Sequence, residues 1–167
     1  MPASAQETSH DCVWEVIARA TVCMMTTRFD GGLRARPLEP RPDREAGVIW
    51  FLTDSRGAKD DEIDADPNVC VTIVDDRQKA YLSLAGEASV GRDPDRARLL
   101  WNAHQQVWWP GGPEDPCLRV IRFVPHRAEL WDGPASAAVA AFEFRSALRT
   151  GRKPNLGEKR KVTVRLR

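Results

Sequence analysis

The chain has 167 residues, enough for one domain with its own hydrophobic core. Hydrophobic residues make up 42% of it and charged residues 29%, which is typical of a soluble globular protein. The formal net charge of +1 argues against a protein that binds nucleic acid through a basic surface. We find no apolar run long enough to span a membrane and no secretory signal, and we therefore expect a cytoplasmic protein.

The first half of the chain alternates between helix and strand patterns. Apolar residues at helical spacing predict the first helix, and the sequence Phe-Asp-Gly-Gly at 29–32 is a turn that closes hairpins. A later helix should end before Pro67, because a proline disfavours helix in the residue before it. In order, the predicted elements are a helix over 9–20, strands over 22–28, 33–42 and 47–53, a helix over 57–65 and a strand over 68–76.

The second half begins with a long strand pattern that contains a bend at Gly86. Asp93-Pro94 opens a short helix, and a tryptophan-rich loop shaped by prolines and glycines follows it. The alternation of Val162, Val164 and Leu166 indicates a short strand or a docked tail. In order, the predicted elements are a strand over 79–90, a helix over 95–102, a loop over 108–116, two strands within 117–133 broken at Pro125, and a helix over 135–148.

Six or seven strands joined mostly by hairpins predict an antiparallel sheet around one core. We therefore expect a mainly β fold, a β-barrel with flanking α-helices, formed as a single domain over residues 1–167 with a C-terminal helix and tail. No GxGxxG motif follows a strand, so a Rossmann domain is not expected.

The stretch FLTDSRGAKDDEI, residues 51–63, places hydroxyl groups, a glycine and cations where a strand passes into a helix. Thr53 and Ser55 offer hydroxyl groups, and Gly57 permits close approach of a ligand to the backbone. Lys59 supplies a positive charge in the first helical turn, where backbone N–H groups are free to bind an anion. These residue types together are those that a phosphate group requires.

Arg34 and Arg36 extend this candidate phosphate site. They lie two residues apart on a predicted strand and therefore on one face of it. A hairpin would bring this strand beside residues 50–54 and place both arginines near Lys59. The alternative is that all three cations are solvated surface charges and that Ser55 only caps the helix. The residues alone leave both interpretations open.

Trp108 and Trp109 lie beside Pro110-Gly-Gly-Pro113 in a shaped loop. These tryptophans can stack on a planar ligand or anchor a dimer interface. The alternative is ordinary packing of the rings in the core beneath a loop, since tryptophan is highly buried on average. Both interpretations stay open.

The remaining candidate residues point to no chemistry of their own. The three histidines lack metal-ligand spacing, so we expect no metal site. The four cysteines sit beside apolar neighbours without a CxxC pair and are expected to be buried, reduced thiols. We assign the acidic run over residues 60–66 to the solvated side of a helix. The histidines are His10, His104 and His126, and the cysteines are Cys12, Cys23, Cys70 and Cys117.

The order of these segments resembles a known family. It runs through RARP, WFLTDSRGAKDDEI, DPNVCVTIVD and YLSLAGEASV to the block LWNAHQQVWWPGGPEDPCLRVIRFVPHRAELWD. This pattern is similar to the bacterial general stress protein branch of the pyridoxamine 5′-phosphate oxidase-like, FMN-binding split-barrel family. The resemblance covers about Val13 to Asp132 and the tail from Leu156 to Val164. The WWPGGP block is its most branch-specific part.

The resemblance implies an antiparallel split barrel that forms a homodimer, with FMN in clefts at the subunit interface. By matching positions, the resemblance implies that the flavin-facing strand is Arg34, Ala35, Arg36 and Pro37. The strand end along the flavin ring and ribityl chain would be Phe51, Leu52, Thr53 and Asp54. Lys59 would bind the phosphate, and Trp108 and Trp109 would cover the ring from the partner subunit. The branch usually has serine or threonine two residues before the lysine, where this chain has Gly57, so Ser55 or Arg56 would have to substitute.

The implied function is a flavin-dependent oxidoreductase of the general stress type with an unknown substrate. The chemistry would be that of the flavin, and no side chain is identified as a catalytic acid or base. The pyridoxamine oxidase's substrate-binding C-terminus has no match here, so vitamin oxidation is not expected. The alternatives are a flavin binder without turnover, a split-barrel protein that uses a deazaflavin or haem, and a scaffold without a cofactor.

Overall fold

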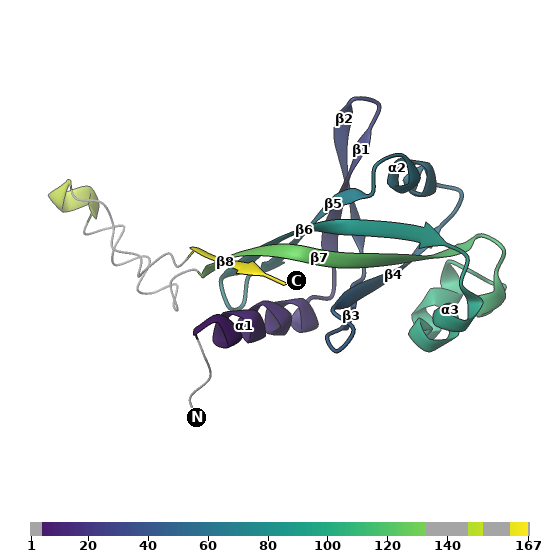
Figure 1. Cartoon of the computed structure of the whole chain (residues 1–167), viewed down its shortest axis with the longest axis horizontal. Helices are drawn as coiled ribbons and strands as arrows, with labels where there is room; N and C mark the ends of the chain where they lie inside the picture. Colours follow the sequence, from purple (N-terminus) through teal and green to yellow (C-terminus); the bar gives the residue numbers. More distant parts are fainter. Residues whose placement is uncertain (1–4, 133–146, 152–160, 167) are drawn as a thin grey trace.

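The computed structural model describes residues 5–132, 147–151 and 161–166, in which an antiparallel sheet curls into a partly open barrel with helices around it (Figure 1). The helices are α1 (Ala5–Arg19), α2 (Lys59–Ala65) and α3 (Pro94–Leu100), with the 3-10 helices η1 (Ala103–Val107) and η2 (Gly112–Glu114). The strands are β1 (Cys23–Phe29), β2 (Gly32–Leu38), β3 (Arg41–Asp43), β4 (Val48–Asp54), β5 (Asn68–Asp75), β6 (Ala80–Gly91), β7 (Leu118–Asp132) and β8 (Lys161–Arg165). They pair in the order β2-β1-β5-β6-β7-β4-β3, and β8 pairs with β7. The predicted fold class, mainly β with flanking helices, is confirmed.

The first hairpin follows directly from its turn residues. β1 ends at Phe29 and β2 begins at Gly32, and the two residues between them, Asp30 and Gly31, have positive φ values of 45° and 74°. Two-residue turns of this kind match the twist of paired strands, and Asp-Gly is among the sequences that favour them. The predicted turn over 29–32 is therefore confirmed.

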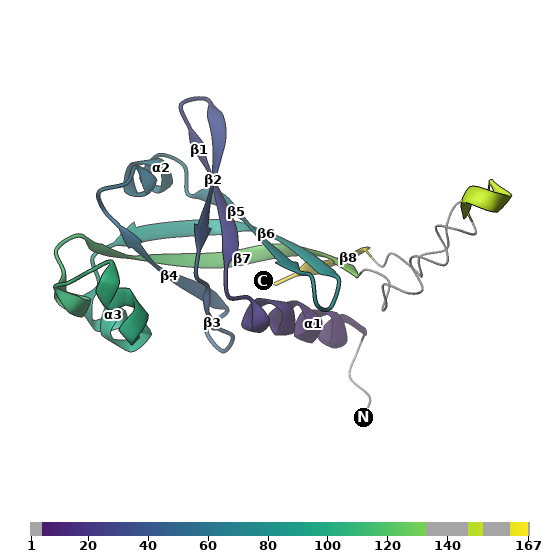
Figure 2. The same ribbon diagram turned by 180° about the vertical axis from the view of Figure 1, so that it is seen from behind.

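One hydrophobic core fills the barrel. α1 contributes Val13, Trp14, Val16 and Ile17 to this core, and α2 contributes Ile63. Figures 1 and 2 show these two helices at opposite ends of the barrel, where each covers an opening. The apolar positions that predicted the first helix are thus the ones that it buries.

The barrel is open between β2 and β4. β2 pairs with β1 at one end of the strand order, and β4 pairs with β7 and β3 at the other. After Leu38 the chain passes through Glu39 and Pro40 into β3, so β2 and β4 meet near β3 and diverge from there (Figure 2). The prediction that a hairpin would set residues 33–37 beside residues 50–54 was wrong in its pairing. β3, and not β2, forms the hydrogen bonds with β4.

β7 is continuous, although the sequence predicted two strands broken at Pro125. The register between β6 and β7 shifts at Gly86, which faces Pro125, whereas Ala85 faces a residue two positions further along β7. His126 is therefore an extra, bulged residue. A bulge tolerates a proline because its ladder hydrogen bonds are already interrupted.

Some elements differ in their bounds from the prediction. Eight strands form where six or seven were predicted, in part because the segment 33–42 divides at Pro40 into β2 and β3. α2 begins at Lys59 with Ala58 as its N-cap, so Ser55 does not cap it. Of the helix predicted over 135–148, only the last two residues are described, and they are helical. The tail strand is confirmed as β8.

The cysteines are free but not uniformly buried. Cys23 is buried, and burial raises the pKa of its thiol to about 12. Cys70 and Cys117 are half-buried, whereas Cys12 is exposed on α1, which corrects the expectation that all four lie inside. Cys12 is exposed because the helix turns Val13, and not its neighbour, toward the sheet.

The close approach of β7 to Gly86 generates a test of the fold. A Cβ at this position would lie 2.1 Å from the Val124 carbonyl oxygen and 2.8 Å from the Pro125 Cα, so Gly86→Ala forces the backbone apart. We expect the free energy of unfolding in urea to fall by about 1–3 kcal/mol or more. Gly91→Ala in the same strand is the control, because a Cβ there meets nothing within 4 Å. Equal urea midpoints for the two variants would contradict the close packing at Gly86.

Candidate functional site

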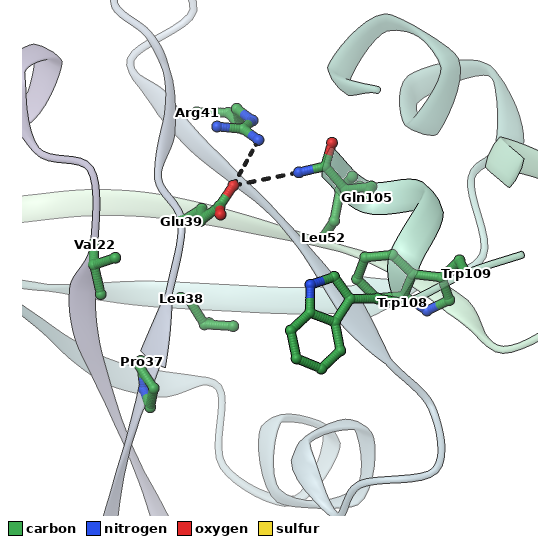
Figure 3. A pocket seen from close by; sticks show the side chains of 9 residues that line it. All are labelled: Val22, Pro37, Leu38, Glu39, Arg41, Leu52, Gln105, Trp108 and Trp109. Carbon is green, nitrogen blue, oxygen red and sulfur yellow. Dashed lines mark hydrogen bonds and ion pairs between the residues drawn. The ribbon is translucent and has the colours of Figure 1, made fainter. Parts of the chain in front are cut away.

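An apolar groove lies where β2 and β4 diverge. It has a volume of about 230 Å³, and its polar lining residues are Glu39, Arg41 and Gln105 (Figure 3). The apolar lining residues are Val22, Pro37, Leu38, Leu52, Trp108 and Trp109. Four of these, from β2, β4 and the loop after α3, are residues that the sequence assigned to a flavin site, although the two tryptophans were expected to reach it from a partner subunit and here line the groove of their own chain. The structure therefore brings together parts of the predicted site that are more than 70 residues apart in the chain.

The free edge of β4 faces this gap. The Ser55 N–H donates to the Cys117 carbonyl over 2.8 Å and so continues the ladder between β4 and β7. In an antiparallel ladder, alternate residues direct both of their backbone groups to the same neighbour. Leu52 and Asp54 therefore direct their peptide groups away from β7, and both lie beyond the three residues of β4 that pair with β3. Leu52 presents both its N–H and its C=O to the groove.

The side chains at this end of β4 have different environments. The Phe51 ring is fully buried in the core, so it does not line the groove. Thr53 is also buried, and its hydroxyl oxygen has no hydrogen-bond partner among the described residues. The Asp54 carboxylate accepts from Arg56 Nε over 2.9 Å, and this hydrogen bond lowers the pKa of Asp54 to about 2. Arg56 is therefore paired with Asp54 in an exposed position beside Gly57.

Lys59 lies at the open end of the gap. Its Nζ is 3.6 Å from the position of a Cβ on Gly57, so the lysine folds back over the turn that precedes α2. Burial lowers the pKa of Lys59, and repulsion from Arg36 lowers it further. Its acidic neighbours Asp54 and Asp60 pair with Arg56 and Arg119, and no carboxylate forms an ion pair with Lys59 within the described part of the chain. The ammonium group is thus half-buried, close to another cation and without a paired anion.

Arg36 and Arg34 meet on one carboxylate of α2. Arg36 Nη1 donates to Thr27 Oγ1 over 3.0 Å, and its Nη2 donates to Glu62. Arg34 Nη1 lies 3.5 Å from the same carboxylate, and its guanidinium stacks 3.8 Å above the Phe29 ring. The two arginines share one face of β2, as their spacing predicted. The alternative of solvated surface charges does not hold for Arg36, whose side chain is 16% exposed.

Glu62 was assigned with the acidic run 60–66 to the solvated side of a helix, and for this residue the assignment was wrong. α2 turns Glu62 and Ile63 toward the barrel, and Glu62 is 4% exposed. Burial alone would raise the pKa of Glu62, but hydrogen bonds from Arg36 and Thr27 outweigh it, so the pKa is lowered. Glu62 is therefore a buried and ionised carboxylate.

Trp108 and Trp109 lie in opposite environments. Trp109 is 7% exposed, packs in a small core under the loop, and has its ring centroid 6.5 Å from that of Trp101. Trp108 is 71% exposed and faces Pro37 and Leu38 across the groove (Figure 3). Core packing, one of the two interpretations of this pair, describes Trp109. The other, a ring available to a ligand or to a partner chain, describes Trp108.

One end of the groove is polar, and sequence reasoning missed it. Glu39 Oε2 accepts from Arg41 Nη2 over 2.8 Å and from Gln105 Nε2 over 3.3 Å (Figure 3). Gln105 is 5% exposed, and its Oε1 accepts from the Asn102 N–H over 2.8 Å in a capping box at the start of η1. The Asn-x-x-Gln spacing of that box was the one signal available. The contact with Glu39 spans 66 residues and leaves no local pattern.

Among the described residues, no three histidine, cysteine, aspartate or glutamate side chains gather into a group that could hold a metal ion. His10 accepts a hydrogen bond from the Trp14 indole over 3.3 Å. No helix in the described part of the chain is long and apolar enough to cross a membrane.

Proteins of known sequence resemble this chain over much of its length. The family model described as pyridoxamine 5′-phosphate oxidase like matches residues 8–155. Protein bli-3 of Neurospora crassa is 30% identical over 110 residues, which are 59% of this chain and 53% of that protein. The chain thus spans about half the length of this curated relative.

Solved structures share the fold. A candidate general stress protein 26 from Jannaschia sp. CCS1 matches with a TM-score of 0.72 and 24% identity over 97% of this chain and 99% of that chain. The general stress FMN/FAD binding protein of Xanthomonas citri matches with a TM-score of 0.66 and 23% identity over 75% of this chain and 89% of that chain. The barrel, open between β2 and β4, is a split barrel. The chain belongs to the pyridoxamine 5′-phosphate oxidase-like family, as the sequence predicted.

The contrast between the two tryptophans can be tested by substitution. Trp109→Ala removes a buried ring, and we expect the free energy of unfolding to fall by about 3–5 kcal/mol. Trp108→Ala is the matched control, for which we expect a change within about 0.5 kcal/mol because the ring is exposed. Urea denaturation followed by circular dichroism measures both without relying on tryptophan fluorescence. A large destabilisation by Trp108→Ala would show that this ring packs against the protein and is not free to contact a ligand in the groove.

Proposed function

We propose that this chain is a cytoplasmic, FMN-binding protein of the general stress type, a homodimer that transfers hydride or electrons to a substrate not yet identified. One observation carries the proposal: the apolar groove and the cation cluster of Arg34, Arg36 and Lys59 are two parts of the same gap. Leu38 of the groove lies on the same face of β2 as Arg36 and Arg34 of the cluster, two residues beyond Arg36. A ligand with a planar apolar ring at one end and a phosphate at the other matches this arrangement.

Polar groups without partners support a ligand of this kind. The Thr53 hydroxyl is buried without a hydrogen bond among the described residues, and buried polar groups normally find a partner. Leu52 offers a backbone donor and a backbone acceptor at the free edge of β4. Lys59 offers an unpaired ammonium group. These residues fit FMN, which has a phosphate, a hydroxylated chain and a ring edge that both donates and accepts hydrogen bonds.

Each residue would have a binding or shielding role. Lys59, with Arg36 and Arg34, would hold the phosphate through charge-assisted hydrogen bonds. Leu52 and Pro37 would flank the ring, and Trp108 would exclude water from it. When bound, the flavin supplies the hydride or electron transfer, and the protein supplies anchoring and orientation.

In the proposed homodimer, a second copy of this chain packs on the outer face of β1, β2 and β5. Met24 lies opposite Pro37 on one side and Thr72 on the other, and this face points away from the core. Met24 is 39% exposed and Val74 is 68% exposed, and apolar exposure of this kind marks interaction surfaces. Because Pro37 belongs both to this face and to the groove, a second copy seated here would also close the groove.

We expect the protein to sediment at twice the mass of one chain. A monomer that retains FMN would contradict this arrangement.

A flavin binder without turnover is the second candidate function. Among the described residues, Glu39 is the carboxylate that lines the groove, and it is already bonded to Arg41 and Gln105, so this part of the chain offers a reacting molecule in the groove no free acid or base. Reduction of the bound flavin separates the two functions. An oxidoreductase that uses a nicotinamide donor would be reduced by NADH or NADPH, whereas a binder would be reduced only by dithionite.

Removal of the lysine charge tests the phosphate site. We expect the wild-type chain to bind FMN more tightly than riboflavin, which lacks the phosphate. Lys59→Ala should weaken FMN binding by about 10- to 100-fold, the worth of a hydrogen bond to a charged group, and leave riboflavin binding unchanged. Quenching of flavin fluorescence measures both affinities, and Arg77→Ala in the turn between β5 and β6 controls for net charge. Equal affinity of the wild type for FMN and riboflavin would refute the proposal.

Gly57 allows a test by gain of function. A Cβ at this position would lie 3.6 Å from Lys59 Nζ and 3.7 Å from the Asp54 carbonyl oxygen, which are ordinary contacts. A serine there would set a hydroxyl beside the ammonium group, and we expect Gly57→Ser to tighten FMN binding by about 2- to 10-fold. Gly57→Ala adds the same Cβ without the hydroxyl and is the matched control. If both variants bind FMN alike, the phosphate does not lie beside residue 57.

A further inference from the structure

Glu62 is a buried carboxylate among the cations assigned to the phosphate. We propose that Glu62 is a positioning residue that fixes Arg36 and Arg34, so that the site discriminates a flavin that carries a phosphate monoester from one that does not. This inference rests on the proposed function and extends it to a residue that would not itself touch the ligand.

The contacts of Glu62 form a closed network across three elements. Glu62 Oε2 accepts from Thr27 Oγ1 of β1 over 2.5 Å, and its Oε1 accepts from Arg36 Nη2. Arg36 Nη1 donates in turn to the same Thr27 oxygen over 3.0 Å. Two nitrogens of one planar guanidinium are therefore held at once, which fixes the direction of its remaining donors.

A purely structural role does not explain a charge at this position. Burial of a carboxylate is unfavourable unless it is paired, and a well-packed apolar residue commonly serves stability as well or better. The neighbouring Ile63 shows how α2 anchors itself to the core without charge. α2 instead places an ionised carboxylate where it reaches Arg36 and Arg34. Such an arrangement is expected where the orientation of the arginines matters.

Glu62 also sets the net charge of the cluster. Arg34, Arg36 and Lys59 contribute three positive charges and Glu62 one negative charge, which leaves +2. A phosphate monoester carries about −1.5 to −2 at pH 7, so the charges nearly match. The negative charge of Glu62 also opposes the lowering of the Lys59 pKa by burial and by Arg36. Glu62 therefore helps to keep Lys59 protonated before the ligand arrives.

Simple electrostatics and positioning predict opposite effects when Glu62 is removed. If the site attracted phosphate by net charge alone, loss of a negative charge would raise the affinity for FMN. If Glu62 positions the arginines, its loss frees both guanidinium groups, adds repulsion beside Lys59 and lowers the affinity for FMN. Riboflavin, which lacks the phosphate, should respond to neither effect.

The experiment compares Glu62→Ala, Glu62→Gln and Asp61→Asn with the full-length wild type, using FMN and riboflavin as probes. Asp61 is exposed on the same helix and forms no ion pair within the described part of the chain, so its variant makes the same charge change without touching the arginines. Fluorescence titration gives the ratio of the two affinities, and urea denaturation confirms that each variant is folded. Glu62→Gln preserves the shape of the side chain and guards against loss of folding in Glu62→Ala.

We expect Glu62→Ala to weaken FMN binding by about 10- to 100-fold and riboflavin binding by less than about threefold. Glu62→Gln should fall between this variant and the wild type, because the amide keeps one acceptor for Thr27 or Arg36. Asp61→Asn should bind FMN as tightly as the wild type or more tightly. The proposal is overturned if Glu62→Ala and Glu62→Gln bind FMN at least as well as the wild type, or if they lose both flavins equally. A wild type without preference for FMN removes the proposed function first, and this inference with it.

Discussion

β2 pairs with β1 along its whole length. Only three residues after β2 ends, the chain begins β3, which pairs with β4. The short connection through Glu39 and Pro40 joins the two halves of the sheet at one point and leaves them free to separate further along. Because strands in a sheet twist relative to one another, the separation grows with distance from that point. The groove, the free edge at Leu52 and the position of α2 all follow from this divergence. A closed barrel would have used the same backbone groups for hydrogen bonds between strands.

Charged side chains line the open end of the gap, whereas mostly apolar side chains line the groove. The three cations at this end are held to different degrees. Arg36 is fixed by two neighbours, Arg34 is held more loosely over Phe29, and Lys59 has no paired anion among the described residues. Such a gradient suits a site that needs one rigid and one adaptable contact with an anion. The pairing of Asp54 with Arg56 balances the charges of the adjoining turn.

The sequence predicted the elements well because their signals are local. The Asp-Gly turn, the apolar face of α1 and the alternation of β5 and β6 each depend on neighbouring residues. The errors fell where a distant contact decides. Pro125 stays within a strand because Gly86 on another strand makes room for it, and Glu62 is buried because two arginines of β2 reach it. The split between Trp108 and Trp109 is of the same kind, since adjacent identical residues give no local hint of which one is buried.

β8 joins β7 at a place with consequences for the whole sheet. On one edge of β7, β4 covers residues 118–123 and β8 covers residues 127–131, on either side of the bulge at His126. Val164 of β8 is 3% exposed, so this short strand closes the core as well as the edge. A chain that stopped before residue 161 would leave residues 127–131 of β7 with open hydrogen-bonding groups along this edge, beside an exposed apolar surface. Open edges of this kind recruit other chains, so the last strand protects the protein against aggregation.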